Sequence, residues 1–321
     1  MAQPLSEAPV AELDPMTFLT GGVPSALARN AREHGPLFRH ILRFGPDAQQ
    51  EIVFLVGPEA NKLVFHTARE TFSHELGWTP MIGDMMGKGL LNMDNPEWAR
   101  SRKMWNPAFT QAYMETYLPL IQRIITAQTA TWPARGEVDI YAEARTITFT
   151  VAATALAGID QPAEVARLRE LFYLLIPHQM LGSEEAYLEY ERKAWAAKEE
   201  LDATLLRVIR ERRALPADEA PQDVLGMIVR AKDDAGVGLT DAEVLGHLYI
   251  LLVAGHETTT TLGAWTLYNL ATLPEQRARV EAELDALLGA GSAPLTVDAA
   301  RNLKVLDNFI KETGRLHSPV I

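Results

Sequence analysis

Most of this 321-residue chain has the apolar spacing or the composition of α-helices. Apolar residues that recur three to four positions apart are typical of a helix with one buried face. The segments with helical spacing or helix-forming composition are 114–132, 138–157, 164–175, 183–213 and 274–288. A short helix is also expected after Gly57, because Pro58 suits the first helical position. The sequence therefore predicts a mainly α fold.

A small β part is expected near the N-terminus. Residues 37–44 and 51–56 mix apolar and polar residues and are rich in β-forming types. Gly45-Pro46-Asp47 lies between them, and such a turn between two β-type runs is typical of a hairpin.

The longest predicted helix covers residues 241–273. Thr240 to Glu243 has the capping-box pattern, and Pro274 ends the run. At about 1.5 Å per residue the helix would extend roughly 50 Å, enough to cross a domain. It is not a membrane span, because no uninterrupted apolar stretch reaches the roughly 18 to 20 residues required.

A polar stretch, Ala-Gly-His-Glu-Thr-Thr at 254–259, interrupts this apolar helix. Gly and β-branched Thr weaken helices, and a buried carboxylate is costly unless it is paired. Thr258 and Thr259 can bond back to their own helix, which favours a core helix with satisfied hydroxyls. The combination of Gly, Glu and paired Thr favours a functional site instead. The zinc motif His-Glu-x-x-His is excluded, because residue 260 is Thr.

Three motifs resemble the cytochrome P450 heme-thiolate monooxygenases. Ala254-Gly255-x-Glu257-Thr258-Thr259 resembles the central-helix signature of that family. Trp98-Ala-Arg-Ser-Arg102 resembles its heme-propionate helix, and Glu312-Thr-Gly-Arg315 resembles its Glu-x-x-Arg helix. The second and third motifs are each common by chance, but all three in the family's order are specific.

The resemblance implies a cytochrome P450 fold of the bacterial soluble type, in a single domain over residues 1–321. It implies heme b as cofactor and insertion of one oxygen atom of O2 into an apolar small-molecule substrate. Electrons would come from a ferredoxin- or flavin-type reductase.

The resemblance also assigns residues. Thr258 would hold the distal water, and Glu257 would connect that site to bulk protons. Ala254 and Gly255 would lie at the heme, whereas His256 is expected to be a neighbouring helix residue without a catalytic role. Glu312 and Arg315 would be a structural pair that serves folding and heme-pocket assembly.

Trp98 and Arg102 lie one turn apart on a predicted helix and would project from one face. An indole N–H and a guanidinium are donors suited to a carboxylate, which the resemblance implies to be a heme propionate. Arg100 and Lys103 are close by. The alternative is therefore a solvated basic face with a buried Trp beneath it.

The resemblance implies that the segment 76–93 is a variable loop over the distal heme face that contacts the substrate. Its apolar candidates for the substrate pocket are Trp78, Met81, Ile82, Met85, Met86 and Leu90. Met side chains adapt to varied apolar shapes, although a loosely packed core under a loop would use them as well. Glycines at 83, 87 and 89 are expected to make the segment mobile.

The chain departs from the family pattern because it contains no cysteine. The family binds its iron through a cysteine thiolate near the C-terminus, and no residue here can be assigned as a metal ligand in its place. We therefore expect a C-terminally truncated P450 that is inactive on its own. The alternative is a non-enzymatic helical fragment or relic, or one half of a two-chain assembly.

The net charge and the N-terminal sequence indicate which binding partners and which cellular location to expect. The net charge of −12 argues against binding of nucleic acid or of an anionic membrane surface. Residues 1–15 contain three acidic residues and no basic residue, which is unlike a secretory signal or a membrane anchor. A cytoplasmic protein is expected.

Overall fold

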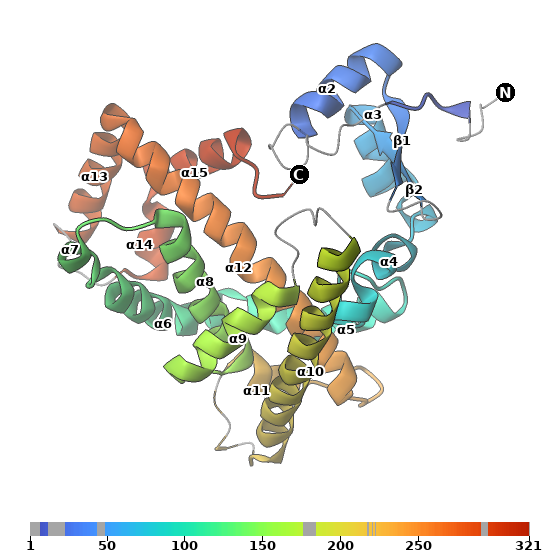
Figure 1. Cartoon of the computed structure of the whole chain (residues 1–321). Helices are drawn as coiled ribbons and strands as arrows, with labels where there is room; N and C mark the ends of the chain where they lie inside the picture. The colour runs from blue at the N-terminus through green and yellow to red at the C-terminus, as the bar shows by residue number, and fades with distance from the viewer. Residues whose placement is uncertain are drawn as a thin grey trace. The chain divides into compact units, whose positions relative to one another are not determined.

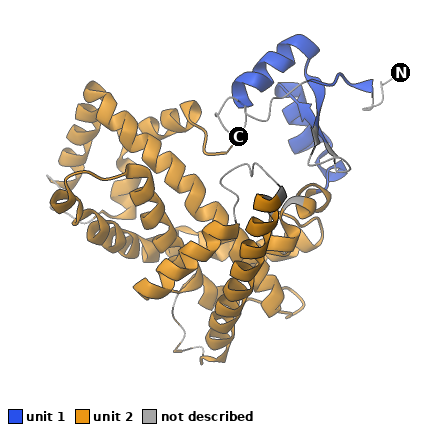
Figure 2. Cartoon of the chain, viewed as in Figure 1, with its two compact units in different colours: residues 1–73, 321 blue, residues 74–320 orange. Residues whose placement is uncertain are grey.

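A computed structural model describes residues 7–11, 23–43, 49–175, 184–216, 218–219, 221, 223–289 and 295–320. The chain divides into two compact units, residues 1–73 with residue 321, and residues 74–320 (Figure 2). We call them unit 1 and unit 2. The central helix and all three of the recognised motifs lie in unit 2.

Unit 1 contains the predicted hairpin. Its elements are α2 (Val23–His34), β1 (Leu37–Arg43), β2 (Gln49–Leu55) and α3 (Pro58–Lys62), followed by single turns η2 (Leu63–Thr67) and η3 (Arg69–Thr71). The strands pair antiparallel, with Leu37 opposite Leu55, and Phe38 stacks on Phe54 at 5.5 Å between ring centroids. The predicted turn at 45–47 lies outside the described residues. Helix α2 was not predicted.

In the described part of unit 2, the regular elements are helices, joined by turns and one isolated β-bridge between Lys232 and Gly238 (Figure 1). Its helices are α4 (His74–Met86), α5 (Glu97–Trp105), η4 (Asn106–Phe109), α6 (Gln111–Thr129), α7 (Trp132–Arg135), α8 (Ile140–Ala157), α9 (Pro162–Leu175), α10 (Glu184–Ala214), α11 (Val224–Ile228), α12 (Asp241–Thr272), α13 (Pro274–Leu288), α14 (Val297–Asn302) and α15 (Lys304–Leu316). The five long segments predicted from the apolar pattern are confirmed as α6, α8, α9, α10 and α13.

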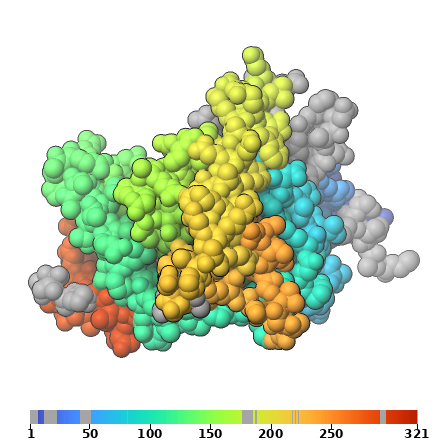
Figure 3. All heavy atoms as spheres, turned by 90° about the horizontal axis from the view of Figure 1, so that it is seen from below, coloured from blue at the N-terminus to red at the C-terminus, as the bar shows by residue number. Residues whose placement is uncertain are grey.

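Helix α12 is the predicted central helix, and its start is fixed by the predicted capping box. Thr240 Oγ1 accepts from the Glu243 backbone N–H at 3.2 Å, and the Glu243 carboxylate accepts from the Thr240 N–H at 2.7 Å. Helix α8 packs along α12, and α10 packs on both α9 and α12. Figure 3 shows α10 as a yellow ridge across one face of unit 2, beside the green of α9.

The prediction of a loop at 76–93 was wrong as far as Met86, because α4 includes residues 74–86. The glycines after it have a packing role. Gly87 has φ 72°, a conformation that glycine adopts without strain, and its backbone meets Gly246 of α12. A Cβ on Gly246 would lie 2.9 Å from the carbonyl carbon of Lys88. Residues 87–89 therefore cross α12 at backbone contact.

A membrane-spanning helix must be both long and apolar. Within the described ranges, no helix combines the two over enough residues to span a membrane.

Candidate functional site

The polar stretch of α12 has two different sides. Ala254, Gly255 and Thr259 are exposed, and Thr258 is half-buried. We call these four residues the open face. Successive helical residues are rotated by about 100°, so His256 points to the other side, where it is fully buried.

The buried side of the stretch packs against α8 and α9. The His256 ring meets Phe149 of α8 edge to face at 5.1 Å and Tyr173 of α9 at 6.0 Å between centroids. Four residues after His256, the Thr260 hydroxyl forms a 2.6 Å hydrogen bond with the hydroxyl of Thr148. The polar groups that the sequence places in an apolar helix are therefore paired across the α8–α12 contact.

Glu257 lies at the border between the two sides and is held by two donors. Arg145 of α8 donates to Glu257 Oε1 from Nε at 3.0 Å and from Nη2 at 2.8 Å. His256 Nε2 lies 3.1 Å from the same oxygen. The Arg145 guanidinium also lies 3.6 Å from the centre of the Tyr173 ring, a cation–π contact that fixes it further.

This pairing determines the charge of Glu257. Burial by itself would raise the pKa of the carboxyl, but hydrogen bonds from His256 and Arg145 and their positive charge lower the pKa to about 2. Glu257 is therefore a carboxylate at neutral pH.

The threonines of the open face bond back to their own helix. Thr258 Oγ1 donates to the Ala254 carbonyl at 2.7 Å, and Thr259 Oγ1 donates to the Gly255 carbonyl at 3.0 Å. Each hydroxyl thereby uses its proton and keeps its lone pairs. Thr258 can accept a hydrogen bond from a molecule on the open face without losing its own bond.

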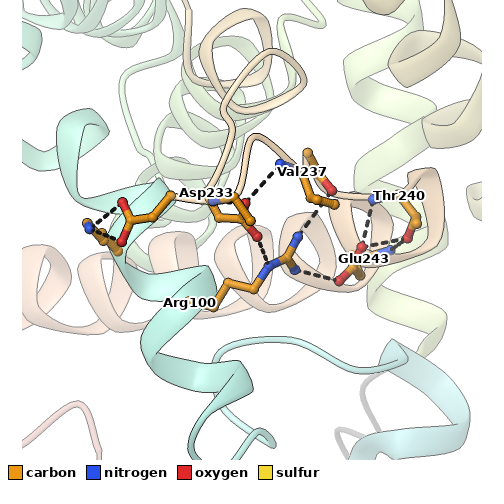
Figure 4. Close-up of polar contacts among 9 residues, drawn as sticks. Arg100, Asp233, Val237, Thr240 and Glu243 are labelled. Atoms are coloured by element: carbon orange, nitrogen blue, oxygen red, sulfur yellow. Dashed lines mark hydrogen bonds and ion pairs between the residues drawn. The ribbon is translucent and has the colours of Figure 1, made fainter.

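The cations of α5 have different surroundings. Arg100 donates from Nε to Asp233 at 2.7 Å, from Nη1 to Glu243 at 3.2 Å and from Nη2 to the Gly238 carbonyl at 3.2 Å (Figure 4). Lys103 is bonded to both carboxylate oxygens of Asp234 at 2.7 Å. These two cations fasten α5 to the segment that leads into α12.

Arg102 and Trp98, the two predicted propionate ligands, both lie on the exposed part of α5. Trp98 is 40% exposed, and the Arg102 guanidinium carbon lies 5.5 Å from the Phe109 ring centre. Within the described ranges no carboxylate is bonded to Arg102. The Trp of this helix that lies fully buried is Trp105.

The predicted substrate residues have different surroundings. Met85, Met86 and Leu90 are half-buried and pack on the core. Ile82 is half-buried, Trp78 is 38% exposed, and the side chain of Met81 lies outside the described residues. Of the six candidates, Met86 alone lines a cavity of about 510 Å³, which it shares with Met93, Lys198, Gly246 and Tyr249 among others.

Glu312 and Arg315 form the predicted pair on α15. Arg315 Nε and Nη2 each donate to one Glu312 oxygen at 2.7 Å, and both side chains are more than half exposed. The buried residue of this helix is Thr313, which accepts a hydrogen bond from Asn269 of α12 at 3.3 Å.

Sequence reasoning missed Arg145, Tyr173 and Thr148. They reach the polar stretch of α12 from helices about 80 to 110 positions earlier in the chain, which spacing alone cannot reveal. One signal existed. Arg145 is the single basic residue of α8, and a lone cation on an apolar helix needs a partner.

Comparison with known proteins agrees with this architecture. The cytochrome P450 family model matches residues 15–321. The chain belongs to the cytochrome P450 family. The sterol 14α-demethylase of Mycolicibacterium vanbaalenii is 27% identical over 282 residues, which are 85% of this chain and 61% of that protein.

Two solved P450 structures have the same fold as this chain. Cyanobacterial CYP120A1 with bound retinoic acid has a TM-score of 0.77 at 25% identity, and the heme domain of cytochrome P450DA has 0.78 at 26%. Each comparison covers 96% of this chain and 69% of the solved one. The chain spans about 61% of the length of the curated P450 relatives that it matches.

P450 membership implies a heme cofactor, and part of this chain fits one. The open face presents an exposed Gly255 and Ala254 at the centre of the longest helix, where a flat ring can approach the backbone. Arg102 and Trp98 present donors for carboxylates. The proximal thiolate has no counterpart, because the sequence contains no cysteine.

Proposed function

We propose that this chain forms the oxygen- and substrate-binding side of a heme-dependent monooxygenase. The observation that carries the proposal is the division of the α12 polar stretch. Small residues and hydroxyls face outward at Ala254, Gly255 and Thr258, while the adjacent carboxylate of Glu257 is anchored on the inner side. A helix built for packing alone has no need of this division.

Bound heme would supply the activation of O2, with electrons from a ferredoxin- or flavin-type reductase. The residues of α12 would position water and protons beside it. The Thr258 hydroxyl, whose proton is used by the Ala254 carbonyl, would accept a hydrogen bond from a distal water and hold that water in place.

Glu257 would act in proton transfer as a carboxylate, not as a resident acid. With its pKa lowered to about 2 by its partners, it holds almost no proton at neutral pH. It can accept a proton transiently from solvent and pass it toward Thr258, or stabilise a protonated water beside it. The anchored geometry therefore favours a relay over a proton store.

Trp98 and Arg102 would bind a heme propionate through the indole N–H and the guanidinium. Arg102 is suited to this role because the neighbouring cations, Arg100 and Lys103, are already bonded to carboxylates. Glu312 and Arg315 would support folding of the heme pocket without taking part in the reaction.

An apolar organic molecule is the proposed substrate class. Two similar proteins act on or bind such molecules, as their names state: a sterol 14α-demethylase and a P450 with bound retinoic acid. Trp78, Ile82, Met85, Met86 and Leu90 would contribute apolar surface from α4 and the segment after it.

This chain by itself supplies no thiolate, because it contains no cysteine. We expect it to be inactive alone and to need a cysteine-containing segment, within one protein or as a second chain. A purely structural helical protein is the alternative, and it would not need the open face of α12.

Replacement of Thr258 by Ala tests the proposal. The enzyme is a holoenzyme in which this chain is completed by the cysteine-containing C-terminal segment of a relative. Loss of the hydroxyl should divert reduced oxygen to hydrogen peroxide and lower product per reducing equivalent. Proton-transfer assistance is typically worth about 10²- to 10⁴-fold, and a water that takes the place of the hydroxyl would recover part of it.

Thr259→Ala is the matched control, since it removes the same back-bonded hydroxyl one position on. Peroxide and product are measured per electron in both variants, and substrate affinity is measured separately. Unchanged coupling in Thr258→Ala would show that Thr258 is a core threonine satisfied by its own backbone, and the site assignment would fail.

A further inference from the structure

His256 makes two polar contacts although its ring is fully buried. Nδ1 lies 2.6 Å from the Leu252 carbonyl oxygen, and Nε2 lies 3.1 Å from Glu257 Oε1. Both neighbours are acceptors, since a backbone carbonyl has no proton and Glu257 is a carboxylate.

Neither neutral form of the ring satisfies both contacts. A neutral imidazole has one N–H and one bare nitrogen. With the proton on Nδ1, the lone pair of Nε2 would face a carboxylate oxygen; with the proton on Nε2, Nδ1 would face the Leu252 carbonyl at 2.6 Å. Only the ring with protons on both nitrogens donates to both acceptors.

We propose that His256 is a buried imidazolium and a positioning residue, which together with Arg145 fixes the charged Glu257 beside the open face of α12. This inference rests on the proposed function, in which Glu257 acts as a proton relay, and adds how that carboxylate is held. It also revises the expectation from sequence that His256 is only a neighbouring helix residue.

The surroundings of the pair agree with two cations on one carboxylate oxygen. From α8, Arg145 donates twice to Glu257 Oε1, and from α9 the face of Tyr173 lies 3.6 Å from the Arg145 guanidinium. A ring face attracts positive charge. Burial raises the pKa of the Tyr141 hydroxyl of α8, and the charge of Glu257 raises it further.

The convergence of donors on Oε1 has a consequence for the relay. Arg145 donates twice to this oxygen and His256 Nε2 lies 3.1 Å from it, so both partners orient the carboxylate through the same atom. A carboxylate anchored through one oxygen has a fixed orientation, which general acid–base chemistry requires.

The charge state of His256 is measured on the full chain by ¹⁵N NMR of labelled histidine at neutral pH. His256→Phe assigns the signal, and the exposed ring of His74 is an internal reference. We expect both His256 nitrogens to carry protons. A spectrum with one bare nitrogen would overturn the proposal. No heme or turnover is needed, so this result is independent of the test on Thr258.

Positioning is tested by following protonation of the Glu257 carboxyl carbon in three chains. His256→Phe keeps the aromatic packing with Phe149 and Tyr173 but removes both donors, whereas His256→Gln restores a neutral donor. We expect the Glu257 carboxyl to protonate at higher pH in His256→Phe and at an intermediate pH in His256→Gln. Equal protonation midpoints in all three chains would reject the positioning role.

A matched experiment removes the acceptor. In Glu257→Gln the carboxylate no longer requires a proton on Nε2, because the side-chain amide can donate to a bare nitrogen. His256 should then become neutral at the same pH. Persistence of both ring protons in Glu257→Gln would show that the carboxylate is not their cause and would also overturn the proposal.

Discussion

The two halves of α12 are buried to different extents. In the first half, Asp241 to Leu252, seven residues from Val244 onward are buried. In the second half the buried residues are His256, Thr260 and Thr266, while Trp265, Leu267 and Tyr268 are exposed. Buried side chains thus lie on nearly all sides of the first half and along one stripe of the second.

The two halves also have different neighbours. In the first half, Tyr249 contacts α9 and α10, and Gly246 contacts residues 87–89. In the second half, Thr260 is bonded to α8 and Asn269 to α15. The open face begins where the dense packing ends, at Ala254. One half of α12 is therefore part of the core, whereas the other half is exposed along one side.

Alanine substitutions at glycines of α12 test the difference in packing between its two halves. Gly246→Ala is expected to have the largest effect on stability. Its Cβ would overlap the Lys88 carbonyl oxygen, and backbone atoms cannot move aside as a side chain can. Overpacking of this kind typically costs about 1–3 kcal/mol. Urea unfolding of the variant chain gives the change in free energy of unfolding.

Gly263→Ala is the control in the second half. A Cβ there meets no atom within 4 Å, so the substitution should stabilise the helix by up to about 1 kcal/mol. Equal effects at the two glycines would show that residues 87–89 do not rest on α12, and the contrast between the halves would be lost.

Substitution of Arg100 tests the ion pairs between α5 and the start of α12. Arg100→Gln removes the cation that Asp233 and Glu243 share, and that cation lowers the pKa of Asp233. We expect a lower free energy of unfolding and no specific effect on heme. Arg102→Gln should do the reverse, with unchanged unfolding and several-fold faster heme loss from the completed holoenzyme to apomyoglobin. If both variants changed the free energy of unfolding and the rate of heme loss in the same way, the two arginines would not have the separate roles proposed here.

Much of the fold was predictable from sequence because a helix has an apolar period and capping residues that can be recognised in the local sequence. The apolar period located α6, α8, α9, α10 and α13, and the capping box located the start of α12. The loop prediction failed for residues 76–86, which belong to α4. Pro80 lies inside α4, and two of the glycines serve a close approach to a distant helix.

The candidate site was predictable only where its residues are neighbours in the chain. Ala254, Gly255, Glu257 and Thr258 were found as one motif, but the partner of Glu257 was not. Arg145 comes from a helix 112 positions earlier, and only the packing of α8 on α12 brings them together. The burial of the His256 ring was not predictable either, because it depends on Phe149 and Tyr173.

Acid should weaken the contact between α8 and its neighbours. Hydrogen bonds from Arg135 and Gln128 lower the pKa of Glu143 to about 2 against the effect of burial, and the pKa of Glu257 is also about 2. Both values lie below the ordinary 4.5, so the stabilisation is complete above pH 4.5 and is lost as the pH falls toward 2. Thermal unfolding as a function of pH should show this loss, and Glu143→Gln should flatten the dependence. A curve with the same slope in the variant would exclude Glu143 as a source.

The smallest expected effect concerns the contact between the second half of α12 and α15. Thr313 is 2% exposed and accepts one hydrogen bond from Asn269 at 3.3 Å. Thr313→Val removes that acceptor at nearly constant volume, and the half-exposed Asn269 can bond to water instead. The cost should therefore be near the lower end of the usual range, about 0.5 kcal/mol. Glu312→Gln, one position earlier, disrupts an exposed ion pair and should leave the unfolding midpoint unchanged. If Glu312→Gln were the more damaging variant in this chain, α15 would depend on its surface pair and not on its contact with α12.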